Sequence, residues 1–204
     1  MKDFILAHLN FKFYQVLWVP LIIFLLTVPA VRFLPISVSY ETGPLETLQL
    51  VFLVLTFAFA LKSKVNKTFF NSMAMIIIIL FLREINCGRT IFFPVPGTEN
   101  GYYSWRDIKY GWLAHPLYGL YMAITAIYFL KHKLFITLWH YVKNIRFPFW
   151  HMLFIFIGML VGIAAEHSLK NPILEEMAEL LFYTALMGIV YLYAFNKDFK
   201  MKEE

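Results

Sequence analysis

The sequence predicts an all-α integral membrane protein with six transmembrane helices. Of its 204 residues, 60% are hydrophobic and only 15% are charged, whereas about a quarter of the residues in a soluble domain are charged. A chain of this length cannot bury so many Phe, Leu and Ile side chains in a core of its own, but a bilayer accommodates them. Six segments also approach the length of about 20 apolar residues that spans a bilayer.

The six predicted helices cover residues 13–34, 45–61, 69–85, 112–130, 148–166 and 172–195. The first is long enough to span and lacks the small-residue cleavage site of a signal peptide, so we expect it to be retained. The third contains the apolar run MIIIILF. His115 and Pro116 open the fourth, and Glu166 with His167 closes the fifth. We treat the chain as one transmembrane domain.

The sixth helix has the clearest start. Asn171 is a suitable N-cap and Pro172 is favoured at the first helical position. Glu175, Glu176 and Glu179 follow, and the helical period of 3.6 residues places all three on one face. That face cannot point at lipid. Glu179 lies two turns into an apolar helix, and intramembrane carboxylates mark functional sites more often than simple packing.

The lysines and arginines predict the orientation, because cytoplasmic loops retain them. One side of the membrane receives Lys2, Lys12, Lys62, Lys64, Lys67, Lys131, Lys133, Lys143, Arg146, Lys197, Lys200 and Lys202. The other side receives nine of the thirteen acids, which are Glu41, Glu46, Glu84, Glu99, Asp107, Glu166, Glu175, Glu176 and Glu179. Both ends of the chain are therefore expected in the cytoplasm. This pattern suits the inner membrane of a bacterium.

Two connections are more than turns. Residues 86–111 contain prolines, glycines and paired aromatics, which favour a lid-like loop folded over the outer helix ends. Residues 131–147 mix basic and aromatic side chains, as in an amphipathic helix lying in the inner interface. That helix is either a docking surface for a cytoplasmic partner or anionic lipid, or a basic interfacial linker. The short, dispersed basic loops make nucleic acid an unlikely partner.

Several ionisable residues are expected at the outer helix ends. The candidates for acid/base catalysis are Glu84, His115, His167, Glu175 and Glu179. Arg83, Arg89 and Arg106 are candidates for binding an anionic substrate, since a guanidinium group fits phosphate or carboxylate. Arg83 beside Glu84 has the simpler interpretation of charge neutralisation. Each histidine has the simpler interpretation of a hydrogen-bonded polar helix end.

A divalent metal, Zn, Mn or Fe, is an alternative occupant, with Glu176, Glu179, His167 and His115 as its ligands. The spacing matches neither Glu-x-x-His nor His-Glu-x-x-His. Without metal, crowded carboxyl groups suit acid/base chemistry or proton-coupled transport. The single cysteine, Cys87, is a weak candidate nucleophile. The sequence contains no serine-hydrolase elbow, P-loop or dinucleotide fingerprint.

These features favour an enzyme, a hydrolase or transferase, that acts on a lipid or a lipid-linked anionic substrate supplied by the surrounding membrane lipids. The first alternative is a proton- or cation-coupled transporter or channel subunit. Against it, the chain is short and the inner half of the bundle is nearly free of ionisable residues. The second alternative is a non-catalytic assembly subunit whose polar residues hold helices together.

Overall fold

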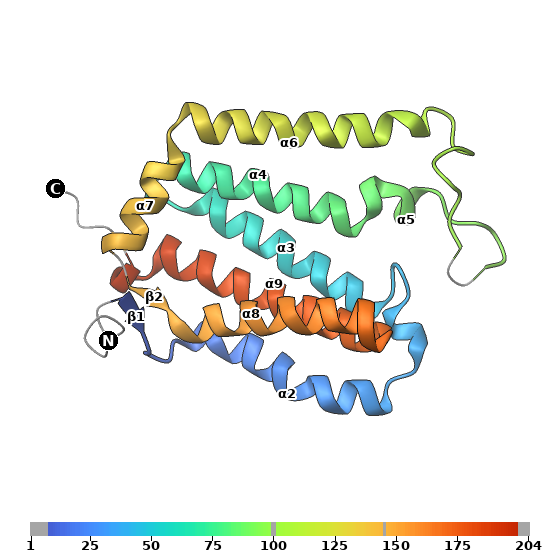
Figure 1. Cartoon of the computed structure of the whole chain (residues 1–204), viewed down its shortest axis with the longest axis horizontal. Coiled ribbons are helices and arrows are strands. Elements are labelled where there is room, and N and C mark those ends of the chain that lie inside the picture. Colours follow the sequence, from blue (N-terminus) through green and yellow to red (C-terminus); the bar gives the residue numbers. More distant parts are fainter. Residues whose placement is uncertain (1–7, 99–100, 145, 200–204) are drawn as a thin grey trace.

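The computed structural model describes residues 8–98, 101–144 and 146–199, and its long helices run side by side along one axis (Figure 1). These helices are α2 (Trp18–Phe33), α3 (Pro44–Lys62), α4 (Lys67–Glu84), α6 (Ala114–Lys131), α8 (Phe149–Ala164) and α9 (Pro172–Phe195). The shorter elements are β1 (Leu9–Asn10), α5 (Arg89–Phe92), α7 (Leu134–Asn144), β2 (Phe147–Pro148), a π-helical turn (Ala165–Leu169), and 3-10 turns at Gln15–Leu17, Ile36–Ser39, Asn86–Gly88, Gly111–Leu113 and Lys197–Phe199.

Five of these helical segments are long and apolar enough to cross a membrane. A sixth is obtained when α4 and its continuation Asn86–Phe92 count as one span, with a bend of 60° between them. The bend lies where Cys87 and Gly88 have positive φ angles of 53° and 90°, a conformation that suits glycine far better than other residues. The chain is therefore all-α, as expected, with five or six helices long and apolar enough to cross a membrane. The number of spans and their orientation stay predictions.

Helix ends differ from expectation where the backbone leaves helical geometry. The first helix was expected from residue 13, but Tyr14 is extended and a 3-10 turn precedes α2. The fifth was expected to reach residue 166. Instead α8 ends at Ala164, and a π-helical turn leads to Lys170 in the left-handed conformation. α9 has the expected bounds, and the Asn171 side chain accepts a hydrogen bond from the Leu174 backbone N–H at 3.0 Å.

The two ends of the bundle have different character. At the end that we call inner, β1 pairs in parallel with β2, and the Lys12 ammonium lies 2.9 Å from Asp198. Hydrogen bonds from Lys12 and Tyr14 lower the pKa of Asp198 below its ordinary value. At the other, outer end, the loop between α5 and α6 packs on the start of α3, where the Tyr102 hydroxyl donates to the Glu41 carbonyl at 2.9 Å. Lys2, Glu99, Lys200 and Lys202, used to predict the orientation, lie outside the described residues.

α7 lies at the inner end, within the segment expected to be interfacial (Figure 1). Leu134 and Tyr141 are buried, whereas Phe135, Leu138 and Trp139 are exposed. The Lys143 ammonium lies 5.1 Å from the centre of the Trp139 ring. This mixture of exposed aromatic and basic groups is typical of a helix at a membrane surface. Whether it docks a partner stays a prediction.

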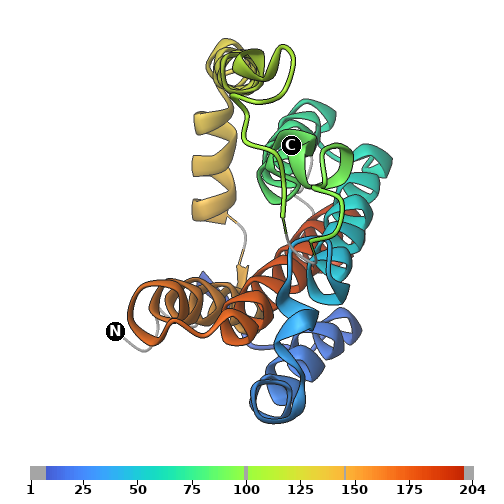
Figure 2. The same ribbon diagram turned by 90° about the vertical axis from the view of Figure 1, so that its right-hand side faces the viewer.

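α9 is the central helix of the bundle (Figure 2). It packs against α8, α3 and α2, and two thirds of it is buried. The other spans bury a third of their residues or less. Their large exposed side chains include Leu25 and Val28 on α2, Leu117 and Ile127 on α6, and Phe156 on α8, which suits contact with lipid tails.

α8 and α9 approach each other closely through two glycines. A Cβ atom at Gly158 would lie 2.8 Å from the Ala178 carbonyl oxygen and 3.0 Å from the Phe182 nitrogen. A Cβ atom at Gly188 would lie 2.3 Å from the ring of His151, which is buried. Small residues at such positions let helices in a membrane pack backbone to backbone.

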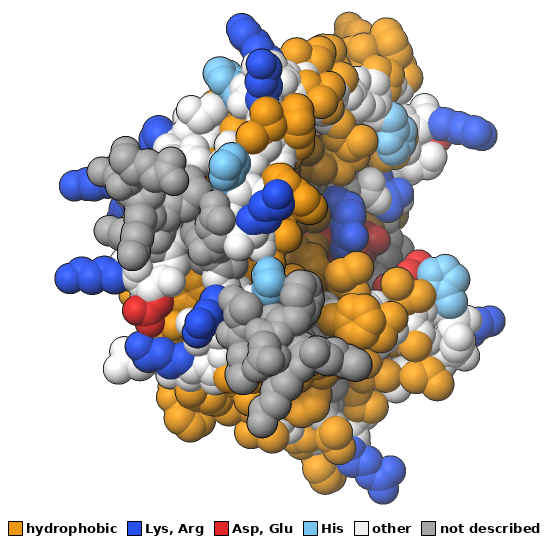
Figure 3. Space-filling model, turned by 60° about the vertical axis from the view of Figure 1, so that its left-hand side comes forward, with side chains coloured by type: hydrophobic (Ala, Val, Ile, Leu, Met, Phe, Trp, Pro, Cys, Tyr) orange, Lys and Arg blue, Asp and Glu red, His pale blue; other side chains and the backbone are white. Residues whose placement is uncertain are grey.

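α6 is held on one side of the bundle. It packs against α4 and continues into α7, whereas α8 packs against α9 on the other side. The surface between α6 and α8 is hollowed, with hydrophobic side chains on its flanks and charged side chains within it (Figure 3). We call this hollow the lateral groove. It opens towards the side of the bundle, where lipid would lie.

Candidate functional site

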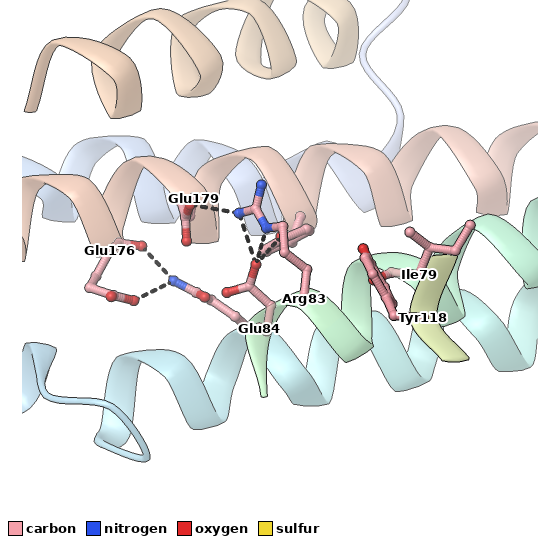
Figure 4. A network of polar contacts seen from close by, with 8 residues as sticks. Ile79, Arg83, Glu84, Tyr118, Glu176 and Glu179 are labelled. Carbon is pink, nitrogen blue, oxygen red and sulfur yellow. Dashed lines mark hydrogen bonds and ion pairs between the residues drawn. The ribbon is translucent and has the colours of Figure 1, made fainter. Parts of the chain in front are cut away.

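An arginine joins two carboxylates from different helices near the outer end (Figure 4). The Nη2 atom of Arg83 on α4 lies 2.9 Å from Glu84 Oε1 and 2.8 Å from Glu179 Oε1 on α9. The Nε atom of Arg83 also donates to Glu84 Oε1 at 3.0 Å. The hydroxyl group of Tyr183 donates to the same oxygen at 2.6 Å. Glu84 is thus fixed in place by two different donors.

A second polar contact joins α3 to α9. The Gln49 Nε2 atom donates to Glu176 Oε2 at 2.7 Å and to the Glu176 carbonyl oxygen at 3.0 Å. Gln49 is fully buried, and its Oε1 atom has no hydrogen-bond partner among the described residues. One turn earlier on α3, Glu46 is 5% exposed and accepts a hydrogen bond from the Thr42 backbone N–H.

These contacts bring four carboxyl groups into mutual electrostatic contact. We call Glu46, Glu84, Glu176 and Glu179 the outer acid cluster. Arg83 is the one basic side chain with a described ion pair to any of them. Acids therefore outnumber bases in the cluster. Burying such an excess costs free energy, so a chain keeps it where it serves a purpose.

Local sequence explains why these groups meet. Asn171 and Pro172 begin α9, and Glu176, Glu179 and Tyr183 then follow at spacings of three and four residues, which form one stripe on a helix. Pro44 begins α3 after Gly43, whose Cβ atom would lie 2.6 Å from the Tyr40 carbonyl oxygen. The start of α3 therefore needs glycine, and Glu46 and Gln49 share one face of the helix.

Part of the cluster is accessible. The side chain of Arg83 is 55% exposed and that of Glu179 is 28% exposed, while Glu84 is 8% exposed beneath them. α4 and α9, which carry these residues, form the floor between α6 and α8 (Figure 2). Basic and acidic side chains are visible in the hollow of that face (Figure 3). A molecule in the lateral groove would therefore meet Arg83 and Glu179 first.

The inner half of the same region is apolar. Leu53, Ile77 and Val190 are buried in one hydrophobic cluster that continues inward from Tyr183. A cavity of about 180 Å³ between α3 and α4 is lined by apolar side chains such as Phe57 and Phe81. A second cavity, of about 530 Å³, lies at the inner end beside Tyr14. Neither of these two cavities is lined by the outer acid cluster.

The other predicted acids and histidines have no described hydrogen bond or ion pair to the cluster. Glu175 interacts electrostatically with Glu166 and His167, and also with Arg83 and Glu179. His167 is 69% exposed and lies 3.4 Å from Glu166. His115, at the start of α6, packs its ring edge-on against Trp105, with 5.9 Å between ring centres. No described contact joins either histidine to Glu179.

The three predicted arginines are likewise separated. Arg83 is held between Glu84 and Glu179, so its charge is already compensated. Arg89 is half-buried at the start of α5. With the Asn86 side-chain oxygen oriented towards Arg89, this oxygen accepts a hydrogen bond from Arg89 Nη2 at 2.8 Å. Arg106 is exposed in the outer loop. No described contact joins the three arginines, and a shared anion-binding site stays a prediction.

The predicted metal ligands are not brought together either. Within the described residues, no three His, Cys, Asp or Glu side chains are close enough to hold a metal ion. The expected set of Glu176, Glu179, His115 and His167 therefore does not converge. His115 lies on α6 and His167 lies on the π-helical turn. Both side chains are exposed.

Two residues of the site escaped sequence reasoning because neither is charged. Gln49 is a polar residue one turn after Glu46 within an apolar helix, and Tyr183 is one turn after Glu179. Helical spacing from a known acid was the signal that could have found both. Comparisons of the chain with family models, with curated proteins and with solved structures found no match.

Proposed function

We propose that this multi-pass membrane protein is an enzyme, a hydrolase or transferase, that acts on a lipid or lipid-linked substrate at its outer acid cluster. The observation that carries the proposal is the ion pair of Arg83 with Glu179, both partly exposed, on the two helices α4 and α9 that lie between α6 and α8. The apolar chain of a lipid would contact the hydrophobic flanks of the lateral groove, and its polar head would contact the charged side chains within it. The membrane supplies molecules of this kind directly.

The contacts suggest a division of roles. Glu179 is the more accessible carboxylate, so we assign it the transfer of a proton to or from the substrate. Glu84 receives hydrogen bonds from Arg83 and Tyr183, and we assign it the positioning of Arg83. A carboxylate that is held between an arginine and a tyrosine keeps its neighbours in a fixed geometry, which acid/base catalysis needs.

Replacing Glu179 by glutamine is expected to abolish the reaction, with a loss of at least about 100-fold, the range for removal of a general acid or base. The assay is mass spectrometry of a membrane lipid extract incubated with the purified protein. Wild type should consume one lipid species and form another. Glu166→Gln is the matched control, because Glu166 is an exposed carboxylate near the same end of the bundle whose described ion pair is with His167.

Two outcomes of this assay would contradict the proposed function. Equal turnover by wild type and the Glu179→Gln variant would remove Glu179 from the mechanism. An unchanged lipid extract with wild-type protein, across extracts from several sources, would speak against an enzyme of lipid chemistry. Circular dichroism on each variant checks that its helices are intact.

One observation favours a second candidate, a proton- or cation-coupled carrier. The outer acid cluster has four carboxyl groups, and Arg83 is paired with only two of them, Glu84 and Glu179. Intramembrane acids also serve as relay sites. The apolar packing of Leu53, Ile77 and Val190 inward of Tyr183 opposes a continuous path. A proton flux assay in liposomes separates the two candidates. Flux that is lost in Glu179→Gln and kept in Glu166→Gln would favour the carrier.

A further inference from the structure

We infer that the outer acid cluster binds a primary ammonium group, so that the lipid headgroup in the lateral groove is an amine. This inference rests on the proposed function for the lipid part of the ligand. An amine ligand differs from the anionic substrate that we expected from the arginines in the sequence. The reasons are the charge of the site, its hydrogen-bond balance and the behaviour of Arg83.

The site has more acceptors than donors. Its acceptors are the oxygens of four carboxyl groups and the Gln49 amide oxygen. The described donors are Arg83, Tyr183, the Gln49 amide nitrogen and the Thr42 backbone N–H, and each of these groups already donates to a carboxylate of the cluster, with the Nη1 atom of Arg83 outside the described contacts. The excess of carboxyl groups favours a ligand that brings N–H or O–H donors and positive charge.

The amide of Gln49 supplies an independent indication. Its Nε2 atom is fixed by two hydrogen bonds to Glu176, so the amide cannot rotate without breaking both. Its Oε1 atom belongs to the same planar group and is buried without a partner among the described residues. An unpaired buried acceptor costs about 1–3 kcal/mol. A donor that reaches this edge of the cluster would remove that cost.

Arg83 already demonstrates the preferred chemistry. Its guanidinium is a cation with N–H donors, placed between Glu84 and Glu179 while 55% of its side chain stays exposed. The position between these carboxylates therefore suits a nitrogen cation that arrives from the groove. Glu179 keeps a second oxygen for such a ligand, because the described contacts use only its Oε1 atom.

Other cations fit less well. A metal ion needs several ligands at about 2.0–2.6 Å, and no three metal-ligating side chains are close enough among the described residues. A quaternary ammonium group has no N–H donor and is recognised by aromatic cages. A primary ammonium group has three donors, which bond carboxylates at about 2.7–2.9 Å. A headgroup with net negative charge would be repelled by the excess of acids.

The test is native mass spectrometry of the full chain in detergent with equimolar phosphatidylethanolamine, phosphatidylcholine and phosphatidylglycerol carrying distinguishable acyl chains of similar length. We expect wild type to retain phosphatidylethanolamine about tenfold over the other two, the effect of one charge-assisted hydrogen bond. Glu179→Gln and Gln49→Met should lose this preference. Glu166→Gln, at an exposed carboxylate whose described ion pair is with His167, should keep it.

The readout separates the two proposals. Lipid retained without any headgroup preference would overturn the ammonium inference and leave the lateral groove as a lipid site. A preference for phosphatidylglycerol would also overturn it and return the arginines to the role predicted from sequence. Failure to retain any of the three lipids would count against the proposed function itself. A preference that persists in both Glu179→Gln and Gln49→Met would place the amine site elsewhere.

Discussion

Arg83→Met is expected to destabilise the protein by about 3 kcal/mol. Breaking a buried ion pair by removing one partner costs about 3–5 kcal/mol, because the remaining charge stays buried without compensation. Arg83 is half-exposed, so we expect the lower end of this range. The variant leaves Glu84 and Glu179 facing each other without a cation. The measurement is reversible unfolding in mixed micelles, followed by circular dichroism.

A compensating variant makes this prediction specific. In Arg83→Met combined with Glu84→Gln and Glu179→Gln, no charge is left unpaired at this position, so most of the lost stability should return. Arg83→Lys should be intermediate, since lysine keeps the positive charge but has no second nitrogen to replace the Nε–H that also donates to Glu84. Wild-type stability of the single Arg83→Met variant would mean that the two carboxyl groups do not need the arginine.

Gly158→Ala is expected to separate α8 from α9 at a cost of about 1–3 kcal/mol, the usual range for overpacking. The new Cβ atom would lie 2.8 Å from the Ala178 carbonyl oxygen and 3.0 Å from the Phe182 nitrogen. Both are backbone atoms of a buried helix, so neither can rotate away as a side chain would. Thermal unfolding of the purified variant measures the effect.

The chain offers two matched controls for this experiment. A Cβ atom at Gly162, one turn further along α8, would meet Ala178 at an ordinary 3.8 Å. Gly119 on α6 has nothing within 4 Å. Alanine at either position should be neutral or stabilising by up to about 1 kcal/mol, because alanine is the better helix former. Equal losses at all three positions would refute close packing at Gly158.

The sequence predicted the helices well where local chemistry determines them. Asn171 and Pro172 define the start of α9 through a cap and a fixed φ angle. Two helix ends were predicted less closely. The prediction took the fifth helix to residue 166 without the π-helical turn at Ala165–Leu169, and it ended the third at residue 85 without the short helix that follows the bend at Gly88. Hydrophobic periodicity reports an apolar face and not the hydrogen-bond pattern of the backbone.

The candidate site was predictable only in part. Charges on an apolar helix drew attention to Glu84, Glu176 and Glu179, which the structure joins through Arg83 and Gln49. The histidines also lie at helix ends. A position near one membrane face does not determine whether a side chain points into the bundle or away from it. Which helices are neighbours depends on packing that one sequence does not reveal, so His115 and His167 were grouped with the acids too readily.

The central position of α9 has a consequence for synthesis of the protein. α2, α3 and α8 all pack on a helix that follows them in the chain, so they enter the membrane before their common partner exists. Arg83 precedes Glu179 by 96 positions, which at about 5–20 residues per second is a delay of roughly 5–20 seconds. During that interval Arg83 has its neighbour Glu84 as a counter-charge, whereas Gln49 has no Glu176 to bond. The nascent helices would therefore depend on the insertion machinery until α9 emerges from the ribosome and draws them together.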